Sequence, residues 1–352
     1  MTDTTELTSE EEQADARHDG AVAGRVAPPV ARPISDEQWR QLLETRTLNP
    51  DAIAQAYQAR RRPDRLVSDR GSLFLVAADH PARGALATGG DPMAMADRRG
   101  LLDRLITALS HPDVDGVLGS PDVIEELLLL GALEGKVVIG SMNRGGLAGA
   151  TWEIDDRFTG YDADSIAERR LEGGKMLLRV VDDDPGTAPT LQACAEAVTR
   201  LAGRRLMAMV EPLPYGRDAA GRLVMRRDTA SLARAVAVSS ALGTTSAYTW
   251  LKLPACDEPQ AVLGATTLPC VVLGGLPGPD PAADLASWAA VLSTPTARGL
   301  VIGRALLYPP DGKVFEAVDA AARLLRRVSS TDPSGGSASG GVANGGREER
   351  GP

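Results

Sequence analysis

The sequence predicts a single (β/α)8 TIM barrel with an N-terminal helical extension, and three observations support this prediction. Short apolar runs alternate with longer amphipathic stretches through most of the 352 residues. Eight such strand–helix pairs follow one another over roughly 255 residues, a usual length for a parallel barrel. The first apolar run is not followed by a GxGxxG turn, which disfavours the alternative, a doubly wound open sheet.

The chain divides into four segments by composition. Residues 1–33 are rich in Glu, Asp, Ala, Gly and Pro and lack periodicity, which predicts a disordered tail. Residues 34–70 are a predicted helical lead-in, with helical spacing from 36 to 60. The barrel is predicted over 71–328. A disordered Gly/Ser-rich tail is predicted over 329–352.

Each predicted strand is a short apolar run typical of a strand buried on both faces. In chain order the predicted strands are 73–79, 115–119, 136–142, 175–181, 206–212, 249–254, 269–275 and 299–304. Apolar residues at three- and four-residue spacing predict the helices between and after them. These helices are 97–109, 121–131, 163–172, 190–202, 229–242, 257–264, 282–292 and 312–327.

Composition excludes several classes of protein. With 43% hydrophobic and 24% charged residues, the chain is typical of a globular protein, and no apolar run approaches the roughly 18 residues of a membrane span. The acidic N-terminus lacks the apolar segment of a secretory signal. Three cysteines without a CxxC pair favour a cytoplasmic location. A net charge of -9 disfavours nucleic acid as a partner.

The carboxyl ends of barrel strands form the active sites of this fold, so polar residues there are the candidates for function. The candidates fall into a catalytic set and a substrate-binding set. The first set is Asp79, Lys175, Glu211 and Lys252. The second set is Arg144, Arg179, Gly274, Gly275, Gly303 and Arg304. His80, Ser141 and Asn143 also follow strands.

The two lysines on predicted strands suggest a chemistry. Only four of the 38 basic residues are lysine, and Lys252 lies between two leucines. Burial lowers the pKa of an amine, and a second cation such as Lys175 lowers it further. A neutral amine forms a Schiff base with a carbonyl substrate, and Glu211 and Asp79 would supply acid and base. The alternative is that Lys252 pairs with Glu211 only to hold the barrel together.

The glycines after the last two strands predict a phosphate site. Gly274 and Gly275 let backbone N–H groups approach an anion, and Arg304 adds a bidentate contact. Alternatively, the glycine pair only turns the chain. A zinc-dependent enzyme needs about three nitrogen or oxygen ligands, and of the histidines only His80 lies at a strand end, with His111 on the opposite face. We therefore expect no metal and no other cofactor.

Six segments occur in the same order as in the class I (Schiff-base) aldolases, which the chain resembles from about residue 72 to 316. They are AAD at 77–79, GK at 174–175, VEPLPYG at 210–216, WLKLP at 250–254, LGG at 273–275 and GRAL at 303–306. The nearest members are fructose-bisphosphate, tagatose-bisphosphate and deoxyribose-phosphate aldolases. The resemblance implies that Lys252 forms the imine, assisted by Lys175 and Glu211. It also implies that Asp79 binds substrate hydroxyls.

Departures from that pattern concern the substrate. The resemblance implies that Arg304 and the backbone of Gly274 and Gly275 hold a phosphate, but Leu273 stands where many members carry a phosphate-contacting serine. Leu213 stands where some carry a second glutamate. Both departures argue against the usual bisphosphate substrates.

The whole chain resembles actinobacterial barrel proteins associated with myo-inositol catabolism. This resemblance implies cleavage of 5-dehydro-2-deoxy-gluconate 6-phosphate to dihydroxyacetone phosphate and malonate semialdehyde. Arg144 or Arg179 is then predicted to bind the carboxylate, and a homo-oligomer is expected. Two alternatives stay open. One is another aldolase of the types named above, or a transaldolase, and the other is a non-catalytic barrel that binds a sugar phosphate.

Overall fold

Eight parallel strands close into a barrel in this computed structural model, which describes residues 32–330 apart from 68 and 70. The tails predicted over 1–33 and 329–352 therefore lie almost entirely outside the described residues. The strands pair in sequence order, and β4 pairs with both β3 and β5, so the sheet has no open edge. They are β1 (Leu73–Ala78), β2 (Gly116–Gly119), β3 (Val137–Ser141), β4 (Gly173–Val180), β5 (Met207–Arg217), β7 (Thr249–Pro254), β8 (Cys270–Leu273) and β9 (Ala297–Ile302). The predicted fold class is confirmed.

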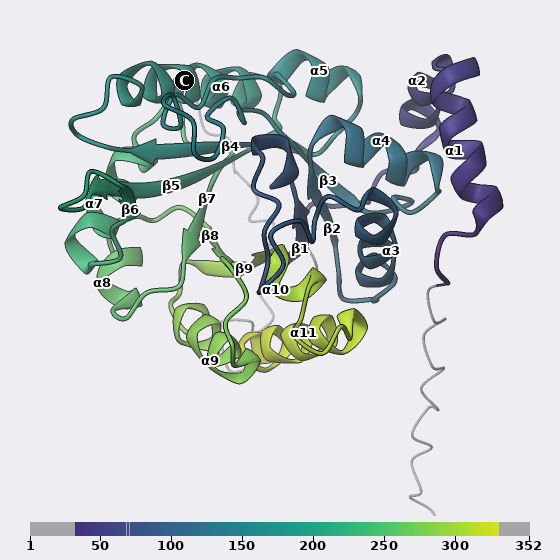
Figure 1. The fold of residues 1–352 in the computed structure, drawn as a ribbon. Helices are drawn as coiled ribbons and strands as arrows, with labels where there is room; N and C mark the ends of the chain where they lie inside the picture. The colour runs from purple at the N-terminus through teal and green to yellow at the C-terminus, as the bar shows by residue number, and fades with distance from the viewer. Residues whose placement is uncertain (1–31, 68, 70, 331–352) are drawn as a thin grey trace, which may run out of the picture.

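Helices surround the strands (Figure 1). They are α3 (Arg98–Leu109), α4 (Pro121–Leu129), α5 (Ala163–Glu168), α6 (Thr187–Gly203), α7 (Thr229–Ser240), α8 (Pro259–Leu263), α9 (Pro281–Leu292), α10 (Arg304–Leu307) and α11 (Val314–Ser330). Several begin where an aspartate side chain accepts a hydrogen bond from the first turn, as Asp97, Asp162, Asp228 and Asp280 do. Such caps satisfy N–H groups that have no partner within the helix.

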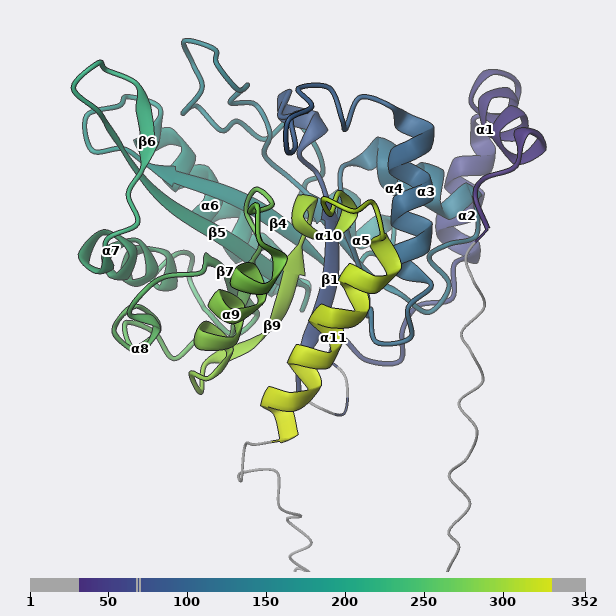
Figure 2. The same ribbon diagram turned by 60° about the horizontal axis from the view of Figure 1, so that its bottom comes forward.

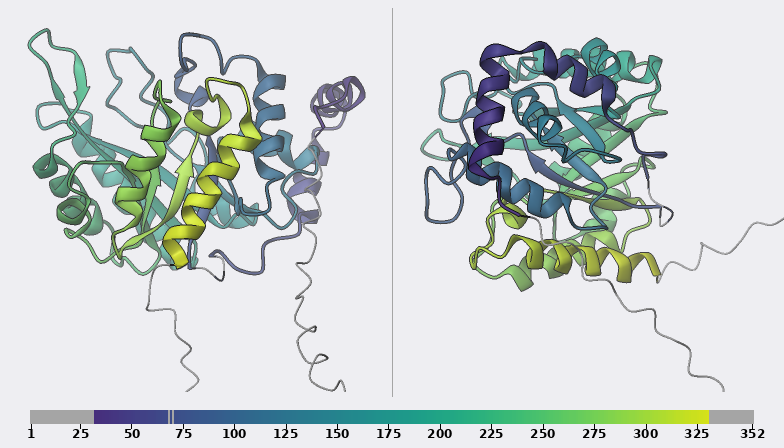
Figure 3. Two further views of the ribbon diagram at one scale, coloured as in Figure 1. Left: turned by 90° about the horizontal axis from the view of Figure 1, so that it is seen from below. Right: turned by 90° about the vertical axis from the view of Figure 1, so that its right-hand side faces the viewer.

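The N-terminal segment differs from the prediction of one continuous helical stretch. It forms two helices, α1 (Asp36–Leu48) and α2 (Asp51–Ala59). The break falls at Asn49 and Pro50, because a proline disfavours helical geometry in the residue before it and donates no backbone hydrogen bond. Both helices lie along one side of the barrel, next to α3 and α4 (Figure 3).

Two arginines anchor this segment to the barrel through a buried glutamate. Arg60 donates to the carbonyl oxygens of Lys136 (2.9 Å) and Arg170 (2.6 Å), and lies 3.0 Å from a Glu172 oxygen. Arg62 lies 2.8 Å from the same oxygen. The second oxygen of Glu172 accepts from the backbone N–H of Val138. The N-terminal segment thus supplies the cations that a buried carboxylate requires.

A hairpin after the fifth barrel strand was not predicted. Strand β5 continues to Arg217 and pairs with the antiparallel strand β6 (Leu223–Met225). The hairpin projects beyond the barrel (Figure 2). Figure 3 shows that it extends from the same end as the β1–α3 and β3–α5 connections. These three segments border the carboxyl ends of the strands.

Alternation along the strands places the site in the interior of the barrel. Apolar side chains from six strands form a separate cluster there, namely Leu73, Leu75, Ala77, Leu118, Val137, Ile139, Met207, Met209, Val271 and Val301, with Trp250 packed against it. Side chains two residues apart on a strand point to the same face. Asp79, Ser141 and Glu211 each lie two residues beyond a member of this cluster, and Lys252 lies two residues beyond Trp250, so all four point inward above the packed layer.

Candidate active site

Five charged side chains of alternating sign meet above the packed interior. Arg144 contacts Asp79, and Lys175 lies 3.4 Å from the same Asp79 oxygen. Lys175 also contacts Glu211, whose other oxygen lies 2.5 Å from the amine of Lys252. All five residues are buried. The structure therefore brings together the four predicted catalytic residues, with Glu211 between the two lysines.

Burial and neighbouring charges perturb the pKa values of these groups. Burial lowers the pKa of Lys252, and the Arg144 and Arg304 guanidiniums lower it further, while Glu211 opposes the shift. Burial and Arg144 hold the pKa of Lys175 well below its ordinary value. Burial alone would raise the pKa of Glu211, but Lys175 and Lys252 hold it well below its usual range. Strongly perturbed pKa values on adjacent acids and bases are typical of sites that transfer protons.

The two lysines differ in access to the cavity at the barrel mouth. This cavity has a volume of about 530 Å³, and both Lys252 and Glu211 line it. The side chain of Lys252 is 5% exposed, whereas that of Lys175 is fully buried and is not part of the lining. A carbonyl compound entering the cavity would therefore reach Lys252 and not Lys175.

The predicted phosphate-binding residues border the same cavity. Gly274, Gly275, Gly303 and Arg304 all line it. A Cβ at Gly303 would lie 2.6 Å from the carbonyl oxygen of Ala77, so the close approach of β9 to β1 requires glycine there. Within the described residues Arg304 makes no ion pair, and its Nε is buried without a hydrogen-bond partner. An unneutralised arginine beside three glycines is suited to an anion.

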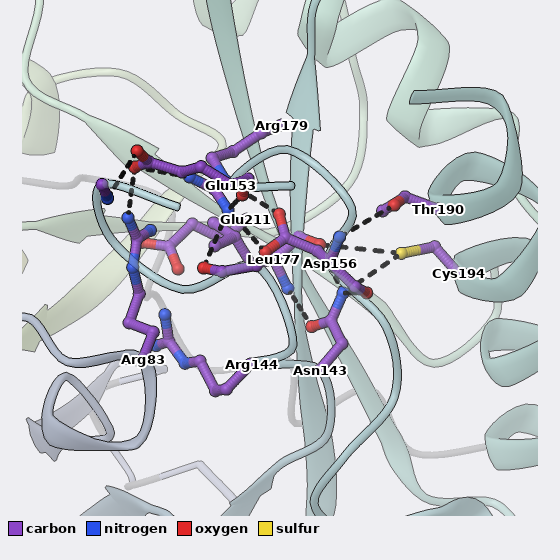
Figure 4. Close-up of polar contacts among 12 residues, drawn as sticks. Arg83, Asn143, Arg144, Glu153, Asp156, Leu177, Arg179, Thr190, Cys194 and Glu211 are labelled. Carbon is purple, nitrogen blue, oxygen red and sulfur yellow. Dashed lines mark hydrogen bonds and ion pairs between the residues drawn. The ribbon is translucent and has the colours of Figure 1, made fainter. Parts of the chain in front are cut away.

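The two arginines predicted to bind a carboxylate lie in different surroundings. Arg144 lines the cavity, although its guanidinium is already bound to Asp79. Arg179 lies outside the cavity lining, is fully buried, and donates to both oxygens of Asp156, at 2.8 and 2.7 Å. It also lies 3.2 Å from Glu153 (Figure 4). The structure therefore does not bring Arg179 to the cavity.

Sequence reasoning missed several residues of this site, including Arg83, Tyr215 and Arg227, which line the cavity. Ser141, which follows a predicted strand, donates to Asp79 (3.1 Å). Arg83 follows the first strand by only five residues, so the strand-end criterion would have found it if extended by one turn. Tyr215 and Arg227 depend on the hairpin, which was not predicted. No three His, Cys, Asp or Glu side chains gather as a metal site within the described part of the chain.

Comparison with known proteins identifies relatives of the chain. A family model described as Cgl0159-like matches residues 71–322. The crystal structure of Cgl0159 from Corynebacterium glutamicum is 47% identical, with a TM-score of 0.81, covering 84% of this chain and 98% of that one. A search of functionally curated proteins finds no match.

More distant structures share the fold. A Schiff-base-forming fructose-1,6-bisphosphate aldolase and an archaeal fructose-1,6-bisphosphate aldolase are each 17% identical, with TM-scores of 0.58. Both alignments cover 78% of this chain, and 99% and 98% of the respective aldolases. At this identity the likeness shows an aldolase-like barrel and nothing finer. No helix among the described residues has the length and apolar character that crossing a membrane requires.

Proposed function

The chain belongs to the Cgl0159-like family, and from its site we propose that it is a class I aldolase that cleaves a phosphorylated keto-sugar acid through a Schiff base on Lys252. The observation that carries the proposal is the placement of Lys252. Its amine borders the cavity and lies 2.5 Å from Glu211, which also contacts Lys175. This arrangement pairs an accessible amine of lowered pKa with a carboxylate that can exchange protons with it.

Imine formation uses these three side chains. The neutral amine of Lys252 attacks the ketone carbon, which forms a C–N bond and leaves a carbinolamine. Glu211, supplied with protons by Lys175, protonates the carbinolamine oxygen, which departs as water and leaves an iminium ion. The lowered pKa of Lys252 favours the first step because only an unprotonated amine is a nucleophile.

Cleavage follows from the positive charge of the iminium ion. Glu211 lines the cavity, whereas Asp79 is buried and outside its lining. Glu211 therefore removes the proton from the hydroxyl on the carbon β to the imine carbon. The electron pair of the adjacent carbon–carbon bond moves to the iminium, giving an aldehyde and an enamine. Protonation of the enamine and hydrolysis by water release the ketone product and restore Lys252. The iminium is the electron sink, so the mechanism requires no metal.

The substrate we propose carries its phosphate next to the ketone. Arg304 and the glycines after β8 and β9 would hold the phosphate, as the sequence predicted. The first candidate is 5-dehydro-2-deoxy-gluconate 6-phosphate, which would give dihydroxyacetone phosphate and malonate semialdehyde. The cationic lining of the cavity suits an acid that carries both a phosphate and a carboxylate.

Reductive trapping tests the proposal. The protein is incubated with dihydroxyacetone phosphate and borohydride, and intact-mass measurement and peptide mapping then locate any adduct. We expect a reduced adduct on Lys252 and none on Lys175. Lys252→Arg should lose essentially all turnover despite keeping the charge, because an arginine does not deprotonate to a nucleophile.

Other outcomes of this experiment would contradict the proposal. An adduct on Lys175 would overturn the assignment of the nucleophile. Absence of any adduct, with the keto-acid phosphate also unreactive, would refute Schiff-base chemistry. Measurable turnover by Lys252→Arg would also refute a Schiff base on Lys252. A screen of acceptor aldehydes in the synthetic direction would distinguish malonate semialdehyde from the acceptors of other aldolases and of transaldolases.

A further inference from the structure

Arg83 is a cation at the cavity that the proposed chemistry does not use. It ends the short 3-10 helix Pro81–Arg83 that follows β1, and its side chain is 15% exposed. One Nη atom lies 3.0 Å from a Glu153 oxygen. Its Nε is buried and has no hydrogen-bond partner. One part of the guanidinium is therefore held by the protein, while another donor is left for an acceptor that the protein does not supply.

A relay of ion pairs fixes the orientation of Arg83. Glu153 contacts Arg83 and also lies 3.2 Å from Arg179. Arg179 is held in turn by both oxygens of Asp156 (Figure 4). All three partners are buried or partly buried, so Arg83 is oriented before any ligand arrives. Preorganisation of this kind reduces the entropy lost on binding.

The β5–β6 hairpin brings two further polar groups to the same cavity. Tyr215 and Arg227 both line it, and Arg227 makes no ion pair within the described residues. Burial raises the pKa of Tyr215, while the Arg179 and Arg83 guanidiniums oppose that rise. The phenol therefore lies within electrostatic reach of Arg83, and it remains a protonated donor at neutral pH.

We propose that Arg83, Tyr215 and Arg227 form a subsite for a second anionic group of the substrate, a carboxylate, distinct from the phosphate held at Arg304. Charge favours a carboxylate: Glu153 offsets one of the two arginine charges, which leaves about one positive charge for a monoanion. This inference rests on the proposed function, because it takes the cavity to be the active site. It specifies the substrate class as a phosphorylated acid. In the cleavage described above, the carboxylate belongs to the aldehyde product.

A matched pair of ligands tests this subsite without turnover. 6-Phosphogluconate and glucitol 6-phosphate differ at one end, where a carboxylate replaces a CH2OH group. Neither has a ketone or aldehyde in its open chain, so neither forms an imine with Lys252. Calorimetric titration of the full chain should show tighter binding of the acid. Arg83→Gln and Arg227→Gln should each reduce that preference by about tenfold and change glucitol 6-phosphate binding little.

Arg226→Gln is the matched control for Arg227→Gln. Arg226 is the neighbouring residue on the same hairpin and is not part of the cavity lining. The Arg226→Gln variant should leave the affinities for 6-phosphogluconate and glucitol 6-phosphate unchanged. Thermal unfolding of each variant checks its fold, and Arg227 is exposed, so its variant carries the test if Arg83→Gln fails to fold.

Three results would overturn the subsite. Equal weakening of both ligands by Arg83→Gln would place Arg83 on the phosphate. Equal affinity of the wild-type protein for both ligands would exclude a carboxylate site. A gain in affinity for glucitol 1,6-bisphosphate but not for the acid would assign the subsite to a second phosphate. None of these results depends on borohydride trapping, so a failed subsite and a failed Schiff base are distinguishable.

Discussion

His80 is an imidazole at the cavity that is kept neutral by its surroundings. Burial and the Arg304 and Lys252 cations hold the pKa of His80 well below its ordinary value. An unfolded chain binds a proton at this histidine below pH about 6.5, whereas the folded chain does not. The His80 contribution to stability is therefore fully present above that pH and is lost as the pH falls.

Replacement of His80 should remove part of the acid sensitivity. Between pH 7.5 and 5.5 this histidine should account for about 1.4 kcal/mol of lost unfolding free energy. Urea unfolding of the wild-type protein and of His80→Gln at several pH values measures this loss of unfolding free energy. The variant should show a shallower decline on acidification, and curves of equal slope would contradict the assignment. His111, whose pKa is also lowered mainly by burial, contributes equally to both proteins.

Individual residues of the site were predictable to different degrees. The strand-end criterion found Asp79, Lys175, Glu211 and Lys252, because alternation and chain direction fix which side chains reach the barrel mouth. It left open which lysine is accessible, since access depends on depth in the barrel, and the register between strands sets that depth. Arg179 was misplaced for a similar reason: its partner Asp156 lies in a connection whose path local sequence does not determine.

Several polar contacts hold the β3–α5 connection to β4, and the fully buried ion pair among them is Arg179 with Asp156. Arg179→Met should cost about 3–5 kcal/mol of unfolding free energy, because it leaves a buried carboxylate without its cation. Arg157→Met is the control on the same connection, since the Arg157 side chain is 79% exposed, and should change stability by less than about 1 kcal/mol. Chemical denaturation measures the unfolding free energy of both variants. Similar small effects would show that the pair does not anchor the connection.

The sequence predicted only part of the β5–β6 hairpin. The sequence predicted a strand over 206–212, which is its apolar part, but the strand runs to Arg217. Pairing with Leu223–Met225 stabilises the extension, and the Asp218 carboxylate in the turn accepts hydrogen bonds from the backbone N–H groups of Ala220 and Arg222. Apolar periodicity reports burial, and most of this hairpin lies outside the core. Predictions based on burial therefore omitted the element that lines one side of the cavity.

Closure of the whole barrel depends on glycines where strands approach closely, and the tightest of these contacts within the strands are at Gly116 and Gly299. A Cβ at Gly299 would lie 1.9 Å from the carbonyl oxygen of Leu73 on β1, and its φ of +141° disfavours other residues. Gly299→Ala should therefore destabilise the protein by about 3 kcal/mol or more. Gly203→Ala, at the end of α6 with open space around it, should be neutral or stabilising. Melting temperatures of the two variants compare them directly. A stable Gly299→Ala barrel would contradict this view of closure.

At the scale of the whole molecule, the prediction of a barrel succeeded because eight repeated units leave few alternative topologies. The predicted homo-oligomer and cytoplasmic location stay predictions, since they depend on surfaces and surroundings that the pattern of strands and helices does not encode. The helical spacing predicted over 36–60 continued across a proline that ends the first helix, so the segment forms two helices.

The buried contact between the N-terminal segment and Glu172 determines where a stably folded fragment of the chain must begin. The family model matches from residue 71, but Arg60 and Arg62, the cations that neutralise Glu172, come earlier in the chain. A fragment starting at residue 71 would leave a carboxylate enclosed without a counter-charge, and should aggregate on expression, whereas one starting at residue 32 should yield a monodisperse, cooperatively melting protein. The segment that the family model matches is thus shorter than the unit that folds.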